Sequence, residues 1–335
     1  MDNHGNLKSG FPQISILMAI YEPRMDWLKE QLLSLNSQTY PNIYLYIQED
    51  CSPNVPFSEI ESCIQGCITA FPYEVERNEK NLGSNGTFER LTQRAEGDYF
   101  AYCDQDDIWL PEKLEHYAQA MEDPEVQLVC SDMYIINEHG EQTASSITKL
   151  RPHHIFHAGE HLASGLLLSN FVTGCAMMCR ADMAKAAVPF CPFMVHDHYL
   201  ALYAAEHGKI AVTEKPWIQY RIHGSNQTLV LSGVTDKKQY QKIRILNPER
   251  RFIWLMAHFP CGKELKADLA DILQWVQARK EYFSGRFGAA GLIWKLRRFS
   301  PLISIYEIVM AHAPEKLFML AIQFLQKKES SSQRI

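Results

Sequence analysis

Three carboxylates stand within four positions of the chain, at Asp104, Asp106 and Asp107. Like charges this close repel one another, so gathering them calls for a positive partner. They follow the apolar run Tyr99–Cys103, and alternate residues of an extended segment point the same way, so we expect Asp104 and Asp106 to face one cleft. Carboxylate oxygens suit Mg²⁺ or Mn²⁺, which commonly keep phosphate oxygens as further ligands. The alternative is a surface turn in which Asp107 caps the helix expected after Pro111, and these residues alone leave both interpretations open.

A Gly- and Asn-rich segment at residues 81–86 precedes a helical pattern over 87–95. Glycine lets backbone amides approach a ligand closely, and the N-terminus of a helix favours phosphate. The segment lacks the Lys of a P-loop, so it is not a signature of ATP hydrolysis. Its spacing alone favours an ordinary turn-rich loop.

Two later motifs also carry residues that could do chemistry. His196, Asp197 and His198 stand at the start of a helical pattern, where one of them could act as a general base or a metal ligand, or Asp197 could simply cap the helix. Arg221 and His223 are two residues apart and share one face if the segment is extended, which would suit a phosphate clamp and a metal ligand. An alternating surface strand explains this second motif equally well.

The elements that would position these residues are indicated by an alternation of apolar runs and helical patterns. Such alternation predicts an open α/β sheet of parallel strands covered by helices, in which ligands bind beyond the carboxyl ends of the strands. Glu22, Asp50, Asn81 and Asp104 each lie just past an expected strand, which makes them candidates from position alone. The expected strands cover residues 14–21, 43–50, 73–78 and 99–103, and the expected helices cover 25–37, 57–70 and 87–95.

The second half of the chain is expected to begin with a helix at 112–121, a strand at 126–132 and a loop-like polar stretch at 137–161. A strand at 171–179, a helix from about residue 196 and two extended pieces within 209–226 follow. From about 237 to 328 the pattern is helical. We therefore predict one domain over residues 1–235 and a helical C-terminal region over 236–335.

Composition excludes some classes of function. A formal net charge of −6 argues against a nucleic-acid-binding surface. Nine irregularly spaced cysteines form neither a disulfide framework nor a zinc pattern, and no signal peptide or transmembrane stretch is recognisable, so a cytoplasmic protein is expected. The C-terminal segment could still lie on the inner face of the cell membrane, since it mixes aromatic and aliphatic residues with Lys295, Arg297, Arg298, Lys316, Lys327 and Lys328. Solvated charges on a helical appendage are the alternative.

Six motifs occur in an order that resembles glycosyltransferase family 2, and within it the rhamnosyltransferase-type enzymes of bacterial surface-polysaccharide assembly such as O-antigen or capsule. The motifs are ISILMAIYEP, QEDCSPN, RNEKNLGSNGTFERL, YFAYCDQDDIWLPEKL, HDHYLAL and YRIHGSNQT, which together cover residues 14–228. The resemblance implies a GT-A fold, a nucleotide-diphosphate-sugar donor, Mn²⁺ or Mg²⁺ as cofactor, and inversion at the anomeric carbon by direct displacement.

The resemblance implies roles for the residues on the donor side. Tyr21 and Glu22 would lie at the nucleotide pocket, and Asp50 would accept a hydrogen bond from the pyrimidine ring. Arg77 and Asn81 would flank the base and the ribose. Further donor contacts would come from Gly83, Asp104 and Arg221. The chain departs from the family pattern by Cys51 in place of Gly and by Glu22 in place of Asn, which affects the details of nucleotide binding more than the class of reaction.

The resemblance also implies a metal site and an acceptor side. Asp106 and His223 would bind the metal that bridges the diphosphate, and Asp197 would be the catalytic base that deprotonates the acceptor hydroxyl. Trp109, together with Asp107 and His196, would line the acceptor side. One metal-binding carboxylate and one separate base would explain why acidic groups occur in two distant motifs.

The expected function is thus an inverting hexosyltransferase, with rhamnose from dTDP-rhamnose as the expected sugar and a saccharide or lipid-linked saccharide as acceptor. A UDP-hexose or UDP-N-acetylhexosamine donor is the nearest alternative. A sugar nucleotidyltransferase would also use paired Asp and Mg²⁺, but it would normally show a Gly-rich, basic triphosphate loop near the N-terminus, which the sequence lacks. A non-catalytic nucleotide-sugar-binding protein is a further alternative, against which the presence of Asp197 argues.

Overall fold

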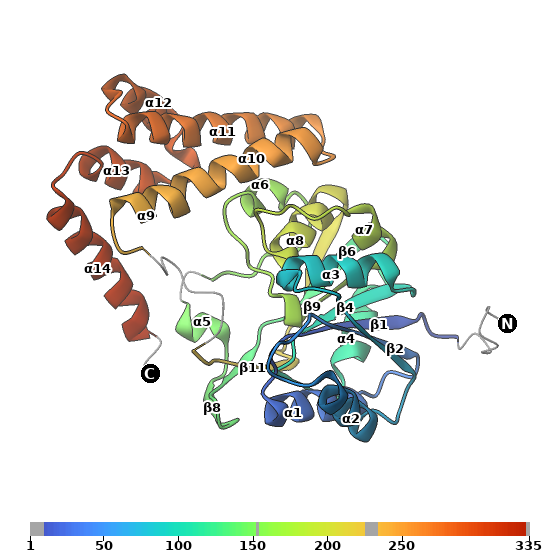
Figure 1. Ribbon diagram of the computed structural model, residues 1–335. Helices are drawn as coiled ribbons and strands as arrows, with labels where there is room; N and C mark the ends of the chain where they lie inside the picture. Colours follow the sequence, from blue (N-terminus) through green and yellow to red (C-terminus); the bar gives the residue numbers. More distant parts are fainter. Residues whose placement is uncertain (1–9, 152–153, 225–233, 333–335) are drawn as a thin grey trace. The chain divides into compact units, whose positions relative to one another are not determined.

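A seven-stranded sheet forms the centre of the first of two compact units in the computed structural model, which describes residues 10–151, 154–224 and 234–332 (Figure 1). The first unit comprises residues up to 190 together with 195–224, and the second comprises 191–194 together with the chain from 225 onward. The last motif quoted above continues through residues 225–228, which lie outside the described residues, as do the side chains of Lys327 and Lys328.

The central sheet has the strand order β10-β6-β9-β4-β1-β2-β3. Strand β1 pairs in parallel with both β2 and β4, β2 pairs in parallel with β3, and β6 pairs in parallel with β10. This arrangement confirms the expected open, mostly parallel α/β sheet. The strands are β1 (Ile14–Ile20), β2 (Ile43–Glu49), β3 (Tyr73–Arg77), β4 (Tyr99–Cys103), β6 (Val126–Cys130), β9 (Met177–Arg180) and β10 (Lys209–Val212).

Strand β9 differs from the expectation in direction and in length. It runs antiparallel to both β4 and β6, and it begins six residues later than the strand expected from residue 171, after a short 3₁₀ turn at Gly174–Ala176. Side chains from two other elements bond to the backbone of this turn. Asp197 accepts the N–H of Gly174, and Lys113 donates to the carbonyl oxygen of Cys175.

A second sheet of four short strands, in the order β5-β11-β7-β8, lies beyond the acidic residues. Its strands are β5 (Ile108–Trp109), β7 (Tyr134–Ile136), β8 (Gln142–Ala144) and β11 (Ile218–Arg221). Strand β8 and the short helix α5 (Ile147–Leu150) fall in the stretch expected to be loop-like. The pairing of β5 with β11 brings the segment after Asp107 beside the segment that carries Arg221.

Helices cover both faces of the central sheet, with α1 and α2 on one side and α3, α7 and α8 on the other (Figure 1). The apolar residues of β1 lie in the core between these layers, where Ile14, Ile16 and Met18 are fully buried. The helices of this unit are α1 (Met25–Asn36), α2 (Phe57–Cys67), α3 (Gly83–Arg94), α4 (Lys113–Ala120), α6 (Ala163–Leu166), α7 (Ala181–Ala186) and α8 (His196–His207).

The second unit is helical, as the sequence predicts, and contains α9 (Lys237–Gln241), a π-helical turn (Lys242–Leu246), α10 (Asn247–His258), α11 (Lys263–Phe283), α12 (Ala290–Lys295), α13 (Pro301–Met310) and α14 (Glu315–Ser332). Its interior includes the fully buried ring of Trp275 and a buried ion pair between Arg279 and Glu307 at 2.6 Å. In the part of the chain that the structure describes, every helix is too short or too polar to cross a membrane.

Candidate active site

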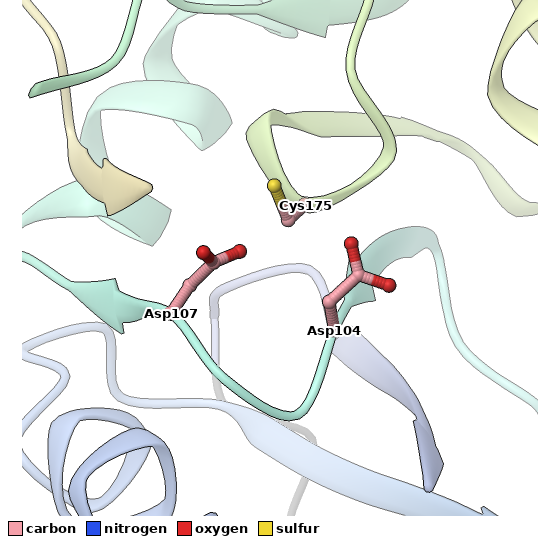
Figure 2. A group of neighbouring side chains, drawn as sticks. All are labelled: Asp104, Asp107 and Cys175. Carbon is pink, nitrogen blue, oxygen red and sulfur yellow. The ribbon is translucent and has the colours of Figure 1, made fainter. Parts of the chain in front are cut away.

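The acidic residues form a bent loop between β4 and β5, and this bend changes which carboxylates meet. Asp104 and Asp107 point toward each other with the Cys175 sulfur beside them, and one ligand atom from each of the three lies within 4.8 Å of the others (Figure 2). The expected pairing of Asp104 with Asp106 on one face of an extended segment is therefore wrong. A bend at residues 105–106 replaces the extended segment, and the Asp106 carboxylate bonds to His223.

Asp107 does not cap the following helix, as the alternative interpretation proposed. Helix α4 begins at Lys113, and the residue before it, Glu112, makes no side-chain cap hydrogen bond. Instead, Oδ1 of the fully buried Asp107 accepts the backbone N–H of Arg221 at 2.9 Å. Its Oδ2 is buried and finds no hydrogen-bond partner of normal geometry among the described residues, although the Cys175 thiol lies beside it. A buried, incompletely satisfied carboxylate is costly unless a cation joins it.

The electrostatics of the loop point in the same direction. Burial, followed by the charges of Asp107 and Asp106, raises the pKa of Asp104 well above its usual range. Burial and the charge of Asp106 also raise the pKa of Asp107, and the hydrogen bond from Arg221 opposes this shift. Carboxylates that destabilise one another's charged forms in this way would regain those forms beside a positive ion.

A buried lysine lies beneath the loop. Lys113 is fully buried, its Nζ donates to the Cys175 carbonyl at 2.5 Å, and it stands 3.3 Å from the centre of the Trp109 ring. Burial lowers the pKa of Lys113 to about 7, while nearby acidic groups, including Asp107 and Asp104, favour its charged form. With a pKa of about 7, Lys113 is only partly charged near neutral pH, so it neutralises only part of the negative charge of the acidic loop.

Trp109 itself belongs to the hydrophobic core, with 1% of its surface exposed. The interpretation that it lines an acceptor surface is therefore wrong, because strand pairing with β11 and the packing of Lys113 against its ring enclose the side chain. His196, which we also expected on the acceptor side, is likewise buried. Its ring lies 4.1 Å from that of Phe88 and 5.4 Å from that of Tyr102, and burial lowers its pKa to about 3, so it packs as a neutral imidazole.

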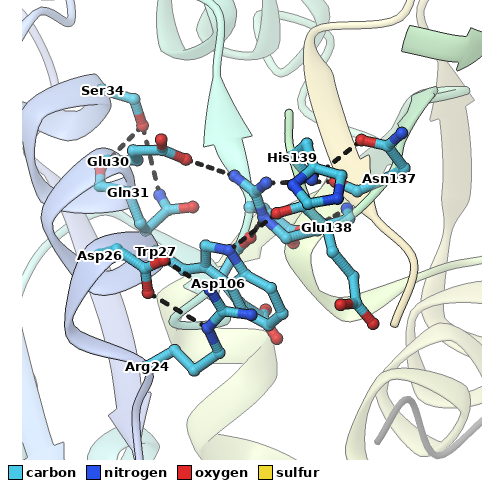
Figure 3. Close-up of polar contacts among 12 residues, drawn as sticks. Arg24, Asp26, Trp27, Glu30, Gln31, Ser34, Asp106, Asn137, Glu138 and His139 are labelled. Carbon is cyan, nitrogen blue, oxygen red and sulfur yellow. Dashed lines mark hydrogen bonds and ion pairs between the residues drawn. The ribbon is translucent and has the colours of Figure 1, made fainter. Parts of the chain in front are cut away.

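Arg221 contacts the acidic loop through both its backbone and its side chain. Its side chain is buried, its Nε donates to the backbone oxygen of Asp106 at 2.8 Å, and its guanidinium also pairs with Glu30 at 2.5 Å. Figure 3 shows the surroundings of this network, in which the ring of Trp27 lies among Asp106, Glu30 and Arg24. The expected contact of Arg221 with a donor is replaced by contacts with the loop that carries the carboxylates.

His223 and Asp106 meet as the sequence motif implies. The His223 Nε2 atom lies 2.8 Å from Oδ2 of Asp106, and its ring centre lies 4.9 Å from that of Trp27. The two side chains that were expected to bind a metal together are thus adjacent, although a hydrogen bond joins them here.

The end of β2 organises the opposite side of the site. Asp50 is buried, its Oδ1 accepts the backbone N–H of Leu82 at 2.7 Å and its Oδ2 accepts that of Gly83 at 2.9 Å. Asn78 also donates to Oδ1 at 2.7 Å. Asp50 therefore satisfies the first free amides of α3, which explains why this helix begins at Gly83 rather than at residue 87. The Asp50 carboxylate already accepts three hydrogen bonds from the protein. A nucleotide base that bonds to Asp50 would therefore have to share the same two oxygens.

The other expected donor residues lie around this point. Arg77 pairs with the fully buried Glu49 through its Nε at 2.9 Å, and Asn81 donates to the Asp50 backbone oxygen at 3.3 Å. Glu22 has a left-handed backbone with φ of 45°, and its carboxylate accepts the backbone and side-chain N–H groups of Asn54, each at 2.8 Å. These bonds lower the pKa of Glu22.

Tyr21 links the first strand to the acidic loop. The amide of Gln105 bonds to the Tyr21 backbone twice, at 2.8 Å and 2.9 Å, while the Tyr21 side chain remains nearly half exposed. An exposed aromatic ring beside polar groups is a suitable surface for a planar ligand such as a nucleotide base. The bend that turns Gln105 toward Tyr21 is the same bend that brings Asp104 and Asp107 together.

Asp197 stands in the first turn of α8 and accepts three hydrogen bonds. Its Oδ2 accepts the N–H of Gly174 at 3.0 Å, and its Oδ1 accepts the Asn170 amide at 3.2 Å and the N–H of His198 at 2.5 Å. Burial raises the pKa of Asp197 to about 6, and the three hydrogen bonds oppose the rise. The charge of Asp197 in turn raises the pKa of Asp104, so the structure brings these two sequence-distant carboxylates into one electrostatic environment.

Several residues that shape this site escaped the sequence analysis. Cys175 is one of nine irregularly spaced cysteines and has no local signal that places it beside the acidic loop. Asn170 and Gly174 carry no local signal of the bonds they make to Asp197. Lys113 could have been noticed, because a lysine six residues after the acidic motif is a natural counter-charge. Its complete burial, however, depends on the distant segment that contains Cys175.

Comparisons with known proteins agree with this fold. The sequence model of the family described as Glycosyl transferase family 2 matches residues 15–185, about half of the chain. An uncharacterized glycosyltransferase of Methanocaldococcus jannaschii is 32% identical over 135 residues, which cover 38% of this chain and 44% of that protein. The chain thus spans less than half the length of this relative. A glucosyltransferase of Escherichia coli, WfgD, is 24% identical over 257 residues, which cover 74% of this chain and 93% of that protein. Its full name is UDP-Glc:alpha-D-GlcNAc-diphosphoundecaprenol beta-1,3-glucosyltransferase.

Two solved structures share the fold at low sequence identity. Staphylococcus aureus TarS, residues 1–349 in complex with UDP-GlcNAc, superposes with a TM-score of 0.55 at 15% identity, covering 89% of this chain and 84% of that one. The mannosyltransferase PcManGT of Pyrobaculum calidifontis, in complex with GDP-Man and Mn²⁺, gives a TM-score of 0.52 at 13% identity and covers 90% of this chain and 84% of that one. At these identities the likeness establishes the GT-A-like fold alone.

Proposed function

Because this chain belongs to glycosyl transferase family 2, we propose that it is an enzyme that transfers a sugar from a nucleotide-diphosphate donor to a hydroxyl of a saccharide or lipid-linked saccharide. The observation that supports this most is that the carboxylates of the acidic loop and the sequence-distant carboxylate of Asp197 lie in one electrostatic environment. In the acidic loop, neighbouring carboxylates destabilise one another's charged forms, so the loop is suited to bind a cation together with the donor diphosphate. The separate Asp197, with a pKa of about 6, is suited to act as a general base.

The proposed reaction is a single displacement with inversion. The acceptor oxygen forms a bond to the anomeric carbon while the bond from that carbon to the diphosphate oxygen breaks, and the diphosphate leaves with the electron pair. The hydroxyl proton passes to Asp197. The hydrogen bonds from Gly174 and Asn170 orient this carboxylate, and its raised pKa makes it a better proton acceptor near neutral pH than an ordinary Asp.

We propose a divalent ion, Mn²⁺ or Mg²⁺, at the acidic loop. The donor set fits such an ion, because Asp104 and Asp107 offer oxygens within reach of one another and Oδ2 of Asp107 is buried without a normal hydrogen-bond partner. The Cys175 sulfur is the poorer ligand of the three for a hard ion. Asp106 and His223 remain proposed ligands, and metal binding would replace the hydrogen bond that joins them. When bound, the ion would neutralise the charge that develops on the leaving diphosphate.

The donor and acceptor follow from resemblance rather than from contacts in the structure. We propose dTDP-rhamnose as the first donor to test, and UDP-glucose and UDP-N-acetylglucosamine as the alternatives, since WfgD is named for UDP-Glc and TarS was solved with UDP-GlcNAc. The name of WfgD, a glucosyltransferase acting on a diphosphoundecaprenol-linked sugar, supports a lipid-linked acceptor in cell-surface polysaccharide synthesis.

A donor screen tests the proposal. Purified full-length protein with Mn²⁺ is incubated with each nucleotide sugar, and release of the nucleoside diphosphate is measured with and without a saccharide acceptor. We expect release with one donor class, faster when acceptor is present, and abolished in Asp104→Asn. In a parallel incubation with added pyrophosphate, conversion of a nucleotide sugar to a nucleoside triphosphate and a sugar 1-phosphate would favour a nucleotidyltransferase. Binding of a donor without release at any acceptor would favour a non-catalytic binding protein.

A further inference from the structure

Helix α13 exposes its apolar side chains and buries its polar ones. Leu302, Ile305 and Val309 are 82%, 46% and 67% exposed, whereas Ser304 and Glu307 are fully buried. The three apolar residues are spaced by three and four positions, so they lie on one face of the helix. A helix on the surface of a water-soluble unit normally has the opposite arrangement, and an exposed apolar face of this kind marks a surface that contacts something apolar.

The buried polar face is fully bonded, which fixes the orientation of the helix. Glu307 accepts hydrogen bonds from both Arg279, at 2.6 Å, and the hydroxyl of Tyr240, at 2.8 Å. The hydroxyl of Ser304 accepts the indole N–H of Trp275 at 3.1 Å. Rotating α13 to bury its apolar face would break these bonds and leave a buried Arg279 without its carboxylate, which is strongly unfavourable. The apolar face is therefore held outward by the interior of the unit itself.

The segment that leads into α13 carries charges of one sign. The segment from residue 282 to 306 contains no Asp or Glu, although acidic residues outnumber basic ones in the whole chain. Its basic residues are Arg286, Lys295, Arg297 and Arg298. Arg298 pairs with Asp268 and Asp271 of α11, and Arg286 pairs with Glu281. Lys295 and Arg297 form no ion pair with any described residue, so they are available to an external anion.

Exposed aromatic residues accompany these charges. Trp294, at the end of α12 and under the Arg297 guanidinium, is half exposed, and Phe287 is more exposed still. Apolar side chains, aromatic rings and unpaired cations in one segment are the composition of a helix that lies in a membrane interface, where the rings sit at headgroup level and Lys and Arg meet anionic lipids.

We infer that the apolar face of α13 (Leu302, Ile305 and Val309), with Lys295 and Arg297 beside it in the sequence, docks on the surface of a membrane that contains anionic lipid. A second copy of this chain fits the same face less well, because two acid-free basic segments would repel each other. The inference does not depend on the transfer reaction, although a lipid-linked acceptor would be found at the same surface.

Vesicle co-sedimentation with the full-length protein tests the inference. Vesicles of phosphatidylglycerol with phosphatidylcholine are compared with vesicles of phosphatidylcholine alone. The Leu302→Ser/Val309→Ser variant should bind the mixed vesicles at least roughly tenfold more weakly, because two exposed aliphatic side chains no longer enter the interface. The matched control, Leu33→Ser/Ile253→Ser, removes two other half-exposed aliphatic side chains from α1 and α10 and should bind like wild type.

A second pair of variants tests the charge. Lys295→Gln/Arg297→Gln should lower binding to the mixed vesicles by roughly fivefold per charge and leave the weaker binding to phosphatidylcholine unchanged. Its control, Lys263→Gln/Lys266→Gln, removes two exposed lysines from the first turn of α11 and should have little effect.

Three results would overturn the inference. Wild-type protein that stays in the supernatant with mixed vesicles would exclude a membrane surface. Equal loss of binding in the α13 variant and its control would show that the effect is not specific to this face. A wild-type dimer in light scattering that becomes a monomer in Leu302→Ser/Val309→Ser would instead assign the face to a second copy. Nucleoside diphosphate release by the α13 variant is also measured without vesicles. This measurement distinguishes failure of the membrane-docking inference from failure of the proposed transfer reaction.

Discussion

The raised pKa of Asp197 makes a quantitative prediction about the pH dependence of transfer. Burial raises this pKa from 3.8 to about 6, and only the ionised carboxylate can accept the acceptor's proton. With a pKa near 6, roughly nine-tenths of the protein carries the ionised base at pH 7 but only about one-tenth does at pH 5. Transfer at saturating donor should therefore fall roughly tenfold between pH 7 and pH 5. A base with the ordinary pKa of 3.8 would remain almost fully ionised over that range.

Two variants connect the profile to this residue. Asp197→Asn keeps the size of the side chain but removes the base, and we expect initial rates to drop by about a hundredfold to ten-thousandfold while donor binding is retained. Asn170→Ala removes a hydrogen bond that lowers the pKa of Asp197, so the midpoint of its pH profile should move to higher pH. Rates of nucleoside diphosphate release, together with donor affinity from calorimetry, measure both effects.

Wild-type transfer that is independent of pH down to pH 5 would show that the base does not have the raised pKa that its burial implies. Undiminished turnover in Asp197→Asn would remove Asp197 as the base altogether. An unchanged midpoint in Asn170→Ala would mean that the profile reports a different group.

Three further predictions concern the acidic loop and the helical unit. A chelator should abolish donor binding measured by calorimetry, and Mn²⁺ should restore it; binding that survives chelation would contradict the metal proposal. Arg221→Met should destabilise the first unit by about 3 kcal/mol in denaturant unfolding, because the variant loses the buried guanidinium that donates to the Asp106 backbone oxygen and pairs with Glu30; unchanged stability would contradict this structural role. Glu307→Ala should cost about 3–5 kcal/mol, since it leaves Arg279 buried without its partner, and a thermal melt identical to that of wild type would show that the pair contributes nothing.

Much of the fold could be predicted because its signals are local. The alternation of apolar runs and helical patterns is a property of neighbouring residues, and it correctly indicated β1 to β4 and the helices between them. The direction of β9 could not be predicted in the same way. Its antiparallel pairing follows a long segment that contains β7, β8 and α5, and direction depends on how that whole segment returns to the sheet.

The candidate site was predictable in part for the same reason. The acidic loop and Asp50 become candidates because they follow expected strands, and Asp197 because it stands at the start of an expected helix. The neighbours that determine their chemistry do not become candidates, since Cys175 reaches Asp107 across the fold and Asn170 reaches Asp197 from a loop. The burial of a single side chain also cannot be inferred from its motif, so Trp109 was expected at a surface although its ring lies in the core. Long-range contact and burial are tertiary properties that a single motif does not encode.

Transfer of the sugar itself is the most direct test of the central proposal. Purified wild-type protein and Asp197→Asn are incubated with Mn²⁺, an equal mixture of dTDP-rhamnose, UDP-glucose and UDP-N-acetylglucosamine, and a lipid-linked saccharide, and the acceptor is then analysed by mass spectrometry. We predict that wild type increases the acceptor mass by one sugar residue from one donor, and that Asp197→Asn does not. An unchanged acceptor with every donor, alongside nucleotide release that is equal in the two proteins, would contradict the proposed function.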